Sequence, residues 1–174
     1  MTAPAGLRIE GARRETLRSR LQALGFEEVR FAAVAGGEGT SLHDWLDAGH
    51  QADLQWMQRT AAKRLQVDLV LPGAQSVIVL GVNYWNDKWR VTSDESKPVW
   101  ARYALHDDYH DTIKPGLVAA GRVLEEMGGI AATDYRYYVD TGPVLERGWA
   151  ARTGRTGGRG CRRWTSWRAA RCSG

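Results

Sequence analysis

The side chain of this sequence best placed to do chemistry is the carboxyl group of Asp140. It follows an alternating stretch, 135–139, that predicts a strand, and it precedes Pro143, which suits the first turn of a helix. In open α/β sheets, ligands gather at such strand ends, because side chains and free helix N-termini converge there. A helix N-terminus lowers the pKa of a carboxyl group, whereas burial raises it. The residues alone allow two interpretations, a ligand-binding carboxyl group or a simple helix cap.

The residue pattern gives little support for a metal site or a nucleotide-binding site. The four histidines are His43, His50, His106 and His110. The pair His106 and His110 straddles the expected start of a helix, so we favour a surface or capping role for it over metal binding. The two cysteines, Cys161 and Cys172, match no metal-site spacing and cannot supply four ligands to an iron–sulfur cluster. The glycines of 36–39 do not continue into a nucleotide-binding fingerprint and predict a turn.

The apolar pattern predicts interleaved helices and strands that position Asp140. Helices are expected over 17–24, 41–49, 53–57, 114–128 and 143–150, and strands over 26–34, 77–82 and 135–139. The stretch 77–82 is a continuous apolar run, typical of a strand buried on both faces. We therefore expect an α/β or mixed α+β fold, with a sheet flanked by helices.

Length and composition favour one soluble domain. The 174 residues are 43% hydrophobic and 25% charged, which is ordinary globular usage. No stretch approaches the roughly 18 to 20 consecutive apolar residues of a membrane span, so we expect a cytoplasmic protein without membrane contact. The net charge of +4 arises from 155–174, which holds six arginines and no acid. Residues 1–154, called the body of the chain below, hold the other 18 basic and all 20 acidic residues, a net charge of −2. This charge argues against a general electrostatic attraction to nucleic acid.

Three segments together resemble the epoxyqueuosine reductases. The first contains Lys63-Arg64 and Leu71-Pro72-Gly73-Ala74-Gln75-Ser76-Val77-Ile78. The second contains Arg102-Tyr103-Ala104 and Asp108-Tyr109-His110-Asp111. The third contains Tyr138-Val139-Asp140-Thr141-Gly142-Pro143-Val144-Leu145-Glu146-Arg147, followed by Ala150-Ala151-Arg152-Thr153-Gly154. Their order and spacing agree with the family across nearly all of 17–154, which is more specific than any single motif.

The resemblance implies a bacterial cytoplasmic enzyme of queuosine biosynthesis. Such enzymes remove the epoxide oxygen of epoxyqueuosine at the wobble position of tRNA, using cobalamin and two [4Fe–4S] clusters. It further implies a nitroreductase-like corrinoid-binding domain with Asp140 as the general acid. The residues that match corrinoid-contacting positions are Arg64, Ala101, Arg102, Asp140 and Arg147.

The resemblance ends after Gly154. The family continues there with two cysteine-rich ferredoxin motifs, whereas this chain continues with an arginine-, glycine- and tryptophan-rich sequence. We therefore expect 1–154 to form the N-terminal cobalamin-binding domain and 155–174 to be a disordered tail produced by a shifted reading frame. A chain of this kind is a fragment without cluster ligands, and we expect it to be inactive alone.

Two alternatives remain open at the level of sequence. A non-catalytic corrinoid-binding module would share Arg64 and Arg102 but would not need Asp140. An RNA-binding protein could instead act through the tail, with its arginines on the phosphates and Trp164 and Trp167 stacking on bases. The slightly acidic body disfavours the second alternative.

Overall fold

The computed structural model describes residues 11–34, 41–84 and 102–153, and the backbone of 162–171. The helices are α1 (Gly11–Ala23), α2 (Ser41–Asp47), α3 (Gln55–Leu65), α4 (Tyr109–Gly128) and α5 (Glu146–Arg152). Short 3-10 turns are η1 (Val67–Leu69) and η2 (Arg102–Leu105). The strands are β1 (Glu28–Ala33), β2 (Ala74–Asn83), β3 (Tyr135–Tyr138) and β4 (Arg162–Arg171). Among the helices described, none is long and apolar enough to cross a membrane.

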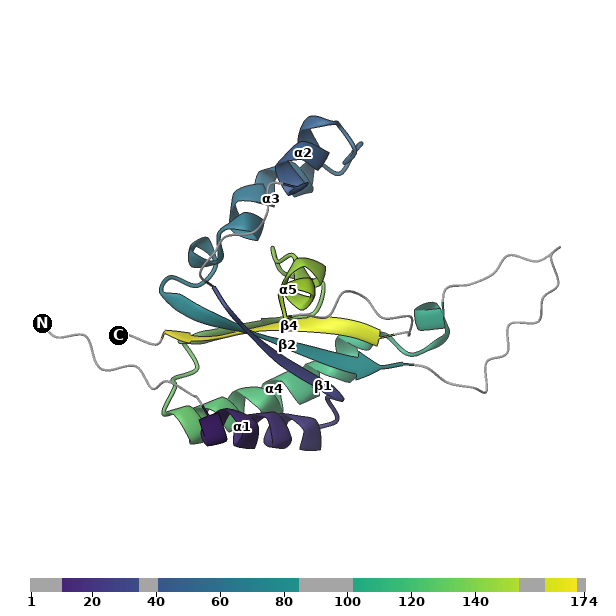
Figure 1. The fold of residues 1–174 in the computed structure, drawn as a ribbon. Helices are drawn as coiled ribbons and strands as arrows, with labels where there is room; N and C mark the ends of the chain where they lie inside the picture. The colour runs from purple at the N-terminus through teal and green to yellow at the C-terminus, as the bar shows by residue number, and fades with distance from the viewer. Residues whose placement is uncertain (1–10, 35–40, 85–101, 154–161, 172–174) are drawn as a thin grey trace, which may run out of the picture.

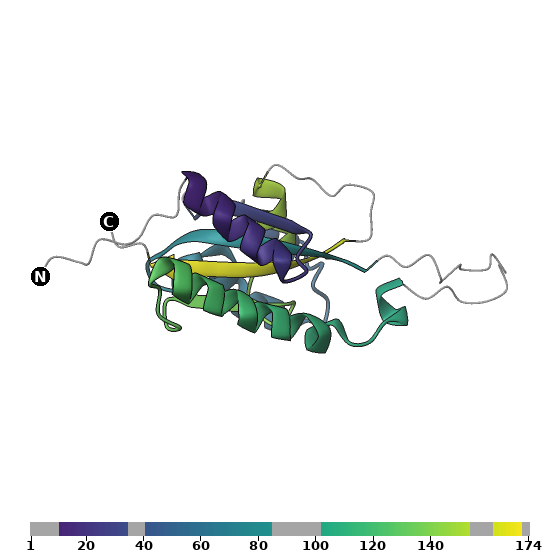
Figure 2. The same cartoon turned by 90° about the horizontal axis from the view of Figure 1, so that it is seen from below.

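The four strands form one antiparallel sheet in the order β1-β2-β4-β3. Helices α1 and α4 contact each other and lie across one face of the sheet, and α5 lies against the opposite face (Figures 1 and 2). On the same side as α5, α2 and α3 extend away from the sheet (Figure 1). This arrangement confirms the mixed α+β class. Because all pairings are antiparallel, the rule for ligands at parallel strand ends does not apply to Asp140.

Strand β2 is buried on both faces, as its apolar run predicts. Ile78 and Leu80 point into a core with α1 and α4, while Val77 and Val79 alternate into a second core that contains Trp149 of α5. Side chains of a strand point alternately to its two faces, so one continuous apolar run fills both cores. A third small cluster lies between α2 and α3 and consists of Leu42, Leu46 and Ala61, with Trp45, Met57, Leu65 and Leu145 packed against it.

Helix α4 begins earlier than the sequence pattern predicts. It starts at Tyr109 rather than near Lys114, so Pro115 lies inside it. The Asp108 side chain accepts a hydrogen bond from the His110 backbone N–H and provides the N-cap, which allows the helix to begin before the proline. The expected end is confirmed, because Gly129 adopts the left-handed conformation at the C-cap.

Helix α5 begins later than predicted, at Glu146 instead of Pro143. The backbone N–H of Val144 donates to the carbonyl of Gly142 at 2.8 Å, which closes a tight turn there. This turn uses the residues that the proline pattern had assigned to the first helical turn. The segment between β3 and α5 is therefore a loop, and it contains Asp140.

Packing of α4 against β3 depends on a close contact at Gly121. A Cβ atom at Gly121 would overlap the hydroxyl group of Tyr135, which donates a hydrogen bond to Glu125 at 2.7 Å. Burial and the neighbouring Glu125 carboxylate raise the pKa of Tyr135 to about 12, so the phenol stays protonated. The missing side chain at Gly121 is thus what lets helix and strand approach.

Residues 162–171 lie within the expected tail and have the backbone of a strand in the structure. These residues form β4, which lies between β2 and β3 and pairs with both. Strand β2 has only one edge covered by β1, and buried backbone N–H and C=O groups on its other edge require partners. A segment containing tryptophan and threonine has suitable β propensity to supply them. The remaining tail residues lie outside the part that the structure describes.

Ser166 tests the role of β4, because it pairs with Val79 of β2 and Tyr138 of β3. Proline at this position removes a backbone donor, so Ser166→Pro should lower the free energy of unfolding by about 2–4 kcal/mol. The control Ser166→Ala should change it by less than about 1 kcal/mol. Urea denaturation followed by circular dichroism measures both. Equal stability of the two variants would show that β4 is not part of the sheet.

Candidate functional site

The backbone at Asp140 is held in a conformation that non-glycine residues rarely adopt. Its φ angle is 56°, in the left-handed region, where Asp is tolerated better than most residues. The backbone N–H of Asp140 donates to Oε1 of Glu146 at 3.0 Å. Gly142, two residues on, lies so close to the ring of Tyr138 that a Cβ atom would overlap it. One side-chain acceptor and one glycine therefore help the loop to keep its shape.

The carboxyl group of Asp140 is paired with a tyrosine from the start of α4. The Oη atom of Tyr109 donates to Oδ2 of Asp140 at 3.0 Å, across 31 positions of sequence. The Tyr109 ring lies against the His110 ring, with a centroid distance of 4.1 Å, and Nδ1 of His110 is 2.8 Å from Oδ1 of Asp108. Asp140 itself is exposed. The arrangement presents a solvent-accessible carboxyl group whose orientation is set by a phenol.

Arg64 approaches the same loop from the last turn of α3. Its Nη1 donates to the carbonyl of Val144 at 3.3 Å, and its Nε donates to Oγ1 of Thr60 at 3.0 Å. The guanidinium lies 5.1 Å from the ring centroid of Trp56, within the range of a cation–π contact. Burial lowers the pKa of Arg64, and the nearby Glu146 carboxylate partly opposes this shift. Arg64 thus connects α3 to the backbone that follows Asp140.

Glu146 interacts with both sides of the site. It accepts the Asp140 backbone N–H, and its charge acts on Arg64. As the first residue of α5, it also has the sign of charge that a helix N-terminus stabilises. Glu146 is therefore the residue through which the loop, α3 and α5 are coupled.

The structure brings together some of the predicted site residues and leaves others unplaced. Arg64 and Asp140 are joined through the 140–146 loop, and Arg147 is exposed on α5 next to Glu146. The backbone of Arg102 belongs to η2, and Ala101 lies outside the described residues.

Sequence reasoning missed the roles of Tyr109 and Glu146. Both lie within the quoted motifs, but nothing in a local pattern indicates which distant group each one contacts. For the described ranges, no group of three or more histidine, cysteine, aspartate or glutamate side chains could hold a metal ion. The groups that are present suit hydrogen bonding and proton donation.

Fold and site together define a mixed α+β domain that presents a tyrosine-bound carboxyl group beside a small antiparallel sheet. The family model described as epoxyqueuosine reductase QueG, DUF1730, matches residues 64–141. An epoxyqueuosine reductase of Synechococcus sp. (strain RCC307) is 34% identical over 155 residues, covering 86% of this chain and 46% of the relative. One from Vibrio cholerae is 36% identical over 135 residues, covering 75% of this chain and 36% of the relative.

Solved structures agree on the fold. Epoxyqueuosine reductase from Streptococcus thermophilus superimposes with a TM-score of 0.67 at 15% identity, over 89% of this chain and 45% of its own. An epoxyqueuosine reductase with an epoxyqueuosine-modified tyrosine tRNA stem loop gives 0.66 at 23% identity, over 89% and 44%. The chain is therefore related to the epoxyqueuosine reductases, and it spans just under half the length of the first of these curated relatives.

The left-handed backbone at Asp140 predicts an unusual stability order for two substitutions. Both Asp140→Ala and Asp140→Gly remove the hydrogen bond to Tyr109, but only glycine adopts a φ of 56° without steric cost. We expect Asp140→Gly to be more stable than Asp140→Ala by about 1 kcal/mol in urea denaturation. If the alanine variant were the more stable, the left-handed conformation at this position would be wrong.

Proposed function

We propose that this chain is the cobalamin-binding, proton-donating front part of an epoxyqueuosine reductase. The observation that carries the proposal is the hydrogen bond from Tyr109 to Asp140. It orients an exposed carboxyl group within the segment that resembles the family's acid motif. Relatives named epoxyqueuosine reductase and the shared fold support the assignment.

In this proposal Asp140 acts as the general acid. Reduction of an epoxide to an alkene consumes two electrons and two protons and releases the oxygen as water. Protonated Asp140 gives its proton to the epoxide oxygen as a carbon–oxygen bond breaks, and a carboxylate remains. The Tyr109 hydroxyl donates to Oδ2 and stabilises that carboxylate by a charge-assisted hydrogen bond. Water supplies the second proton.

Glu146 is the positioning residue for this acid. By accepting the Asp140 backbone N–H, it stabilises the left-handed backbone conformation of that residue. A solved epoxyqueuosine reductase from Bacillus subtilis is described with its catalytic loop swung out of the active site, at 21% identity and a TM-score of 0.64. We propose that the 140–146 loop of this chain moves in the same way when the Glu146 contact breaks.

The hydrogen-bonding groups beside the loop fit a corrinoid. Asp140 and Arg147 are exposed, and a carboxylate and a guanidinium suit the amide-bearing rim of such a ring. We propose that they hold cobalamin together with Arg64, Ala101 and Arg102. When bound, cobalamin supplies the redox chemistry of the reaction. Arg64 keeps the loop backbone in place through Val144, so its contribution includes positioning.

Iron–sulfur clusters do not fit this chain. Its only cysteines are Cys161 and Cys172, whereas a [4Fe–4S] cluster held by cysteines takes four thiolates. Electrons must therefore come from outside the chain. The substrate in this proposal is a tRNA carrying epoxyqueuosine, and the setting is the cytoplasm. Support for the RNA comes from the neighbour solved with a modified tRNA stem loop.

Titration with hydroxocobalamin, followed by absorbance, tests the cofactor assignment. We expect Arg64→Ala and Arg147→Ala to weaken binding about tenfold, or about 1.4 kcal/mol each. Asp140→Asn should bind within about threefold of the unchanged chain, because it keeps the size of the side chain and one oxygen acceptor. Arg14→Ala, which removes an exposed arginine of α1, is the charge-matched control. Failure of the unchanged chain to bind, or equal losses for all three arginine variants, would contradict the assignment.

Turnover measurements test the need for the clusters, and translation of the gene tests the shifted reading frame. Supplied with cobalamin and titanium(III) citrate, the purified chain should convert epoxyqueuosine tRNA far more slowly than a full-length epoxyqueuosine reductase, since it has no cluster ligands to relay electrons to the cofactor. Translation of the gene beyond Ala150 in the other frames should reveal two Cys-x-x-Cys-x-x-Cys-x-x-x-Cys-Pro runs. In the protein restored in that frame, Asp140→Asn should abolish turnover. A corrinoid carrier would have no turnover to lose, and its cobalamin binding would be unaffected by this substitution. Equal turnover by the short chain would contradict the need for the clusters, and the absence of those runs would refute a shifted frame.

A further inference from the structure

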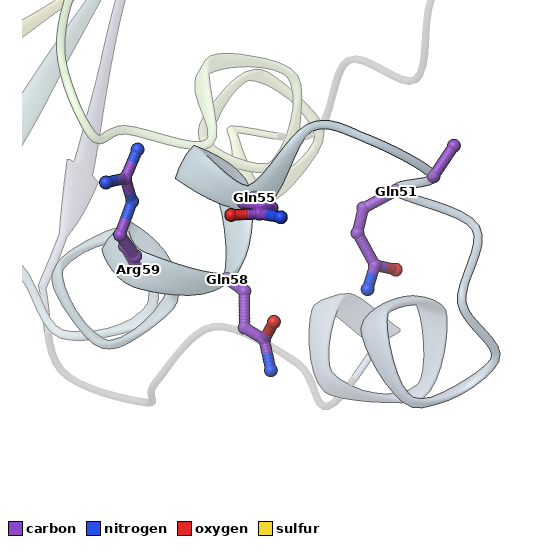
Figure 3. Close-up of a pocket in the computed structure, with 5 residues that line it drawn as sticks. Gln51, Gln55, Gln58 and Arg59 are labelled. Carbon is purple, nitrogen blue, oxygen red and sulfur yellow. The ribbon is translucent and has the colours of Figure 1, made fainter.

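A polar pocket beside α3 plays no part in the site described so far. It has a volume of about 420 Å³ and is lined by Gln51, Ala52, Gln55, Gln58 and Arg59. The side chains of Gln51, from the segment after α2, and Gln58, from α3, extend on the same side of Gln55, and Arg59 lies on its other side with the guanidinium pointing away from them (Figure 3). The pocket lining therefore combines three glutamines with one arginine.

The pocket occupies one of three faces of α3. Residues three or four apart share a face of a helix, and each such set on α3 has a different environment. Met57, Ala61 and Leu65 pack into the cluster with α2. Trp56, Thr60 and Arg64 interact with one another, and Arg64 reaches the loop after Asp140. Gln55, Gln58 and Arg59 form the pocket face, so neither core packing nor the candidate catalytic site accounts for their side chains.

Two features of the preceding segment point to a ligand. Oε1 of Gln51 is buried, and among the described residues it has no hydrogen-bond partner. A buried acceptor without a donor costs about 1–3 kcal/mol, so a turn of the Gln51 side chain that brings this oxygen to a bound donor would be favoured. Ala52 has a φ of 46°, although it is not glycine, and such backbone strain tends to occur at ligand sites. Both features belong to the pocket lining.

We propose that this pocket binds one nucleotide of the tRNA substrate, away from the modified base. Carboxamides carry a donor and an acceptor and match the edges of nucleobases, while a guanidinium matches a phosphate. Arg59 is exposed, and no ion pair occupies it within the described ranges. The inference rests on the proposed function, because that function supplies the RNA.

The charge and length of α3 agree with an RNA contact. The helix carries Arg59, Lys63 and Arg64 and no acidic residue, although the body of the chain is slightly acidic. Its residues from Gln55 to Arg64 span about 13 Å at 1.5 Å per residue. An RNA strand lying along α3 could therefore contact the pocket at one end and the Asp140 loop at the other. Phosphate contacts of this kind fix the register of an RNA without reading its sequence.

Side-chain amide NMR signals test the pocket directly. Adenosine and uridine monophosphates should shift the amide signals of Gln51, Gln55 and Gln58 in the full chain, whereas inorganic phosphate alone should not. Binding of an unmodified tyrosine tRNA anticodon stem loop, measured by fluorescence anisotropy, gives the second readout. Arg59→Ala and Gln58→Ala should each lower the affinity about fivefold, and Arg14→Ala less than about twofold. The control removes the same charge from α1, so non-specific attraction to the phosphates is compared directly.

Three outcomes would overturn the inference: no shift with nucleotides, an equal shift with phosphate, or equal losses for Arg59→Ala and Arg14→Ala. Nucleotide shifts without any effect of Arg59→Ala and Gln58→Ala on stem-loop binding would also overturn it, because the pocket would then serve a free nucleotide. The proposed function is tested separately by hydroxocobalamin. If cobalamin binds normally but nucleotides do not shift the glutamine signals, only this inference fails. If nucleotides shift those signals but cobalamin does not bind, only the assignment as a reductase fails.

Discussion

The burial of β2 on both faces is the constraint on which the rest of the structure depends. Its alternating side chains require a helical layer on each side, which α1 and α4 provide on one face and α5 on the other. Its backbone requires a strand on each edge, which β1 and β4 provide. Loss of any one of these partners would expose either apolar side chains or unpaired backbone groups. The site inherits its geometry from this arrangement, because α4 and α5 carry Tyr109 and Glu146.

The candidate site illustrates how a loop can be positioned by elements that come from different layers. Asp140 lies between β3 and α5, Tyr109 begins α4 on the face of the sheet opposite α5, and Arg64 lies in the last turn of α3. The Asp140 side chain is oriented by Tyr109, while its backbone is held by Glu146. The side chain and the backbone of Asp140 are therefore held by residues of two different helices. This arrangement also leaves the carboxyl group exposed to a substrate.

Helix α3 connects this loop to the surface that carries the polar pocket. One face of the helix is fixed to α2 by apolar packing, and another holds the loop after Asp140 through Arg64. The third face presents glutamines and Arg59 around the pocket. A ligand in the pocket would therefore bind a helix that directly contacts the loop after Asp140.

The sequence by itself determined the local features of this protein. The apolar run at 77–82 indicated a doubly buried strand, Gly25 and Gly129 marked helix ends, and the motif around Asp140 carried the family resemblance. These features depend on periodicity and on backbone preferences of single residues, which neighbouring residues largely fix.

Only the tertiary structure decided which distant groups meet. Tyr109 and Asp140 are far apart in the chain, Glu146 turns back to the Asp140 backbone, and β4 inserts between β2 and β3. The early start of α4 followed from the Asp108 cap, which overcame the signal of Pro115. Such contacts depend on how helices and strands dock, and docking is set by packing over the whole core.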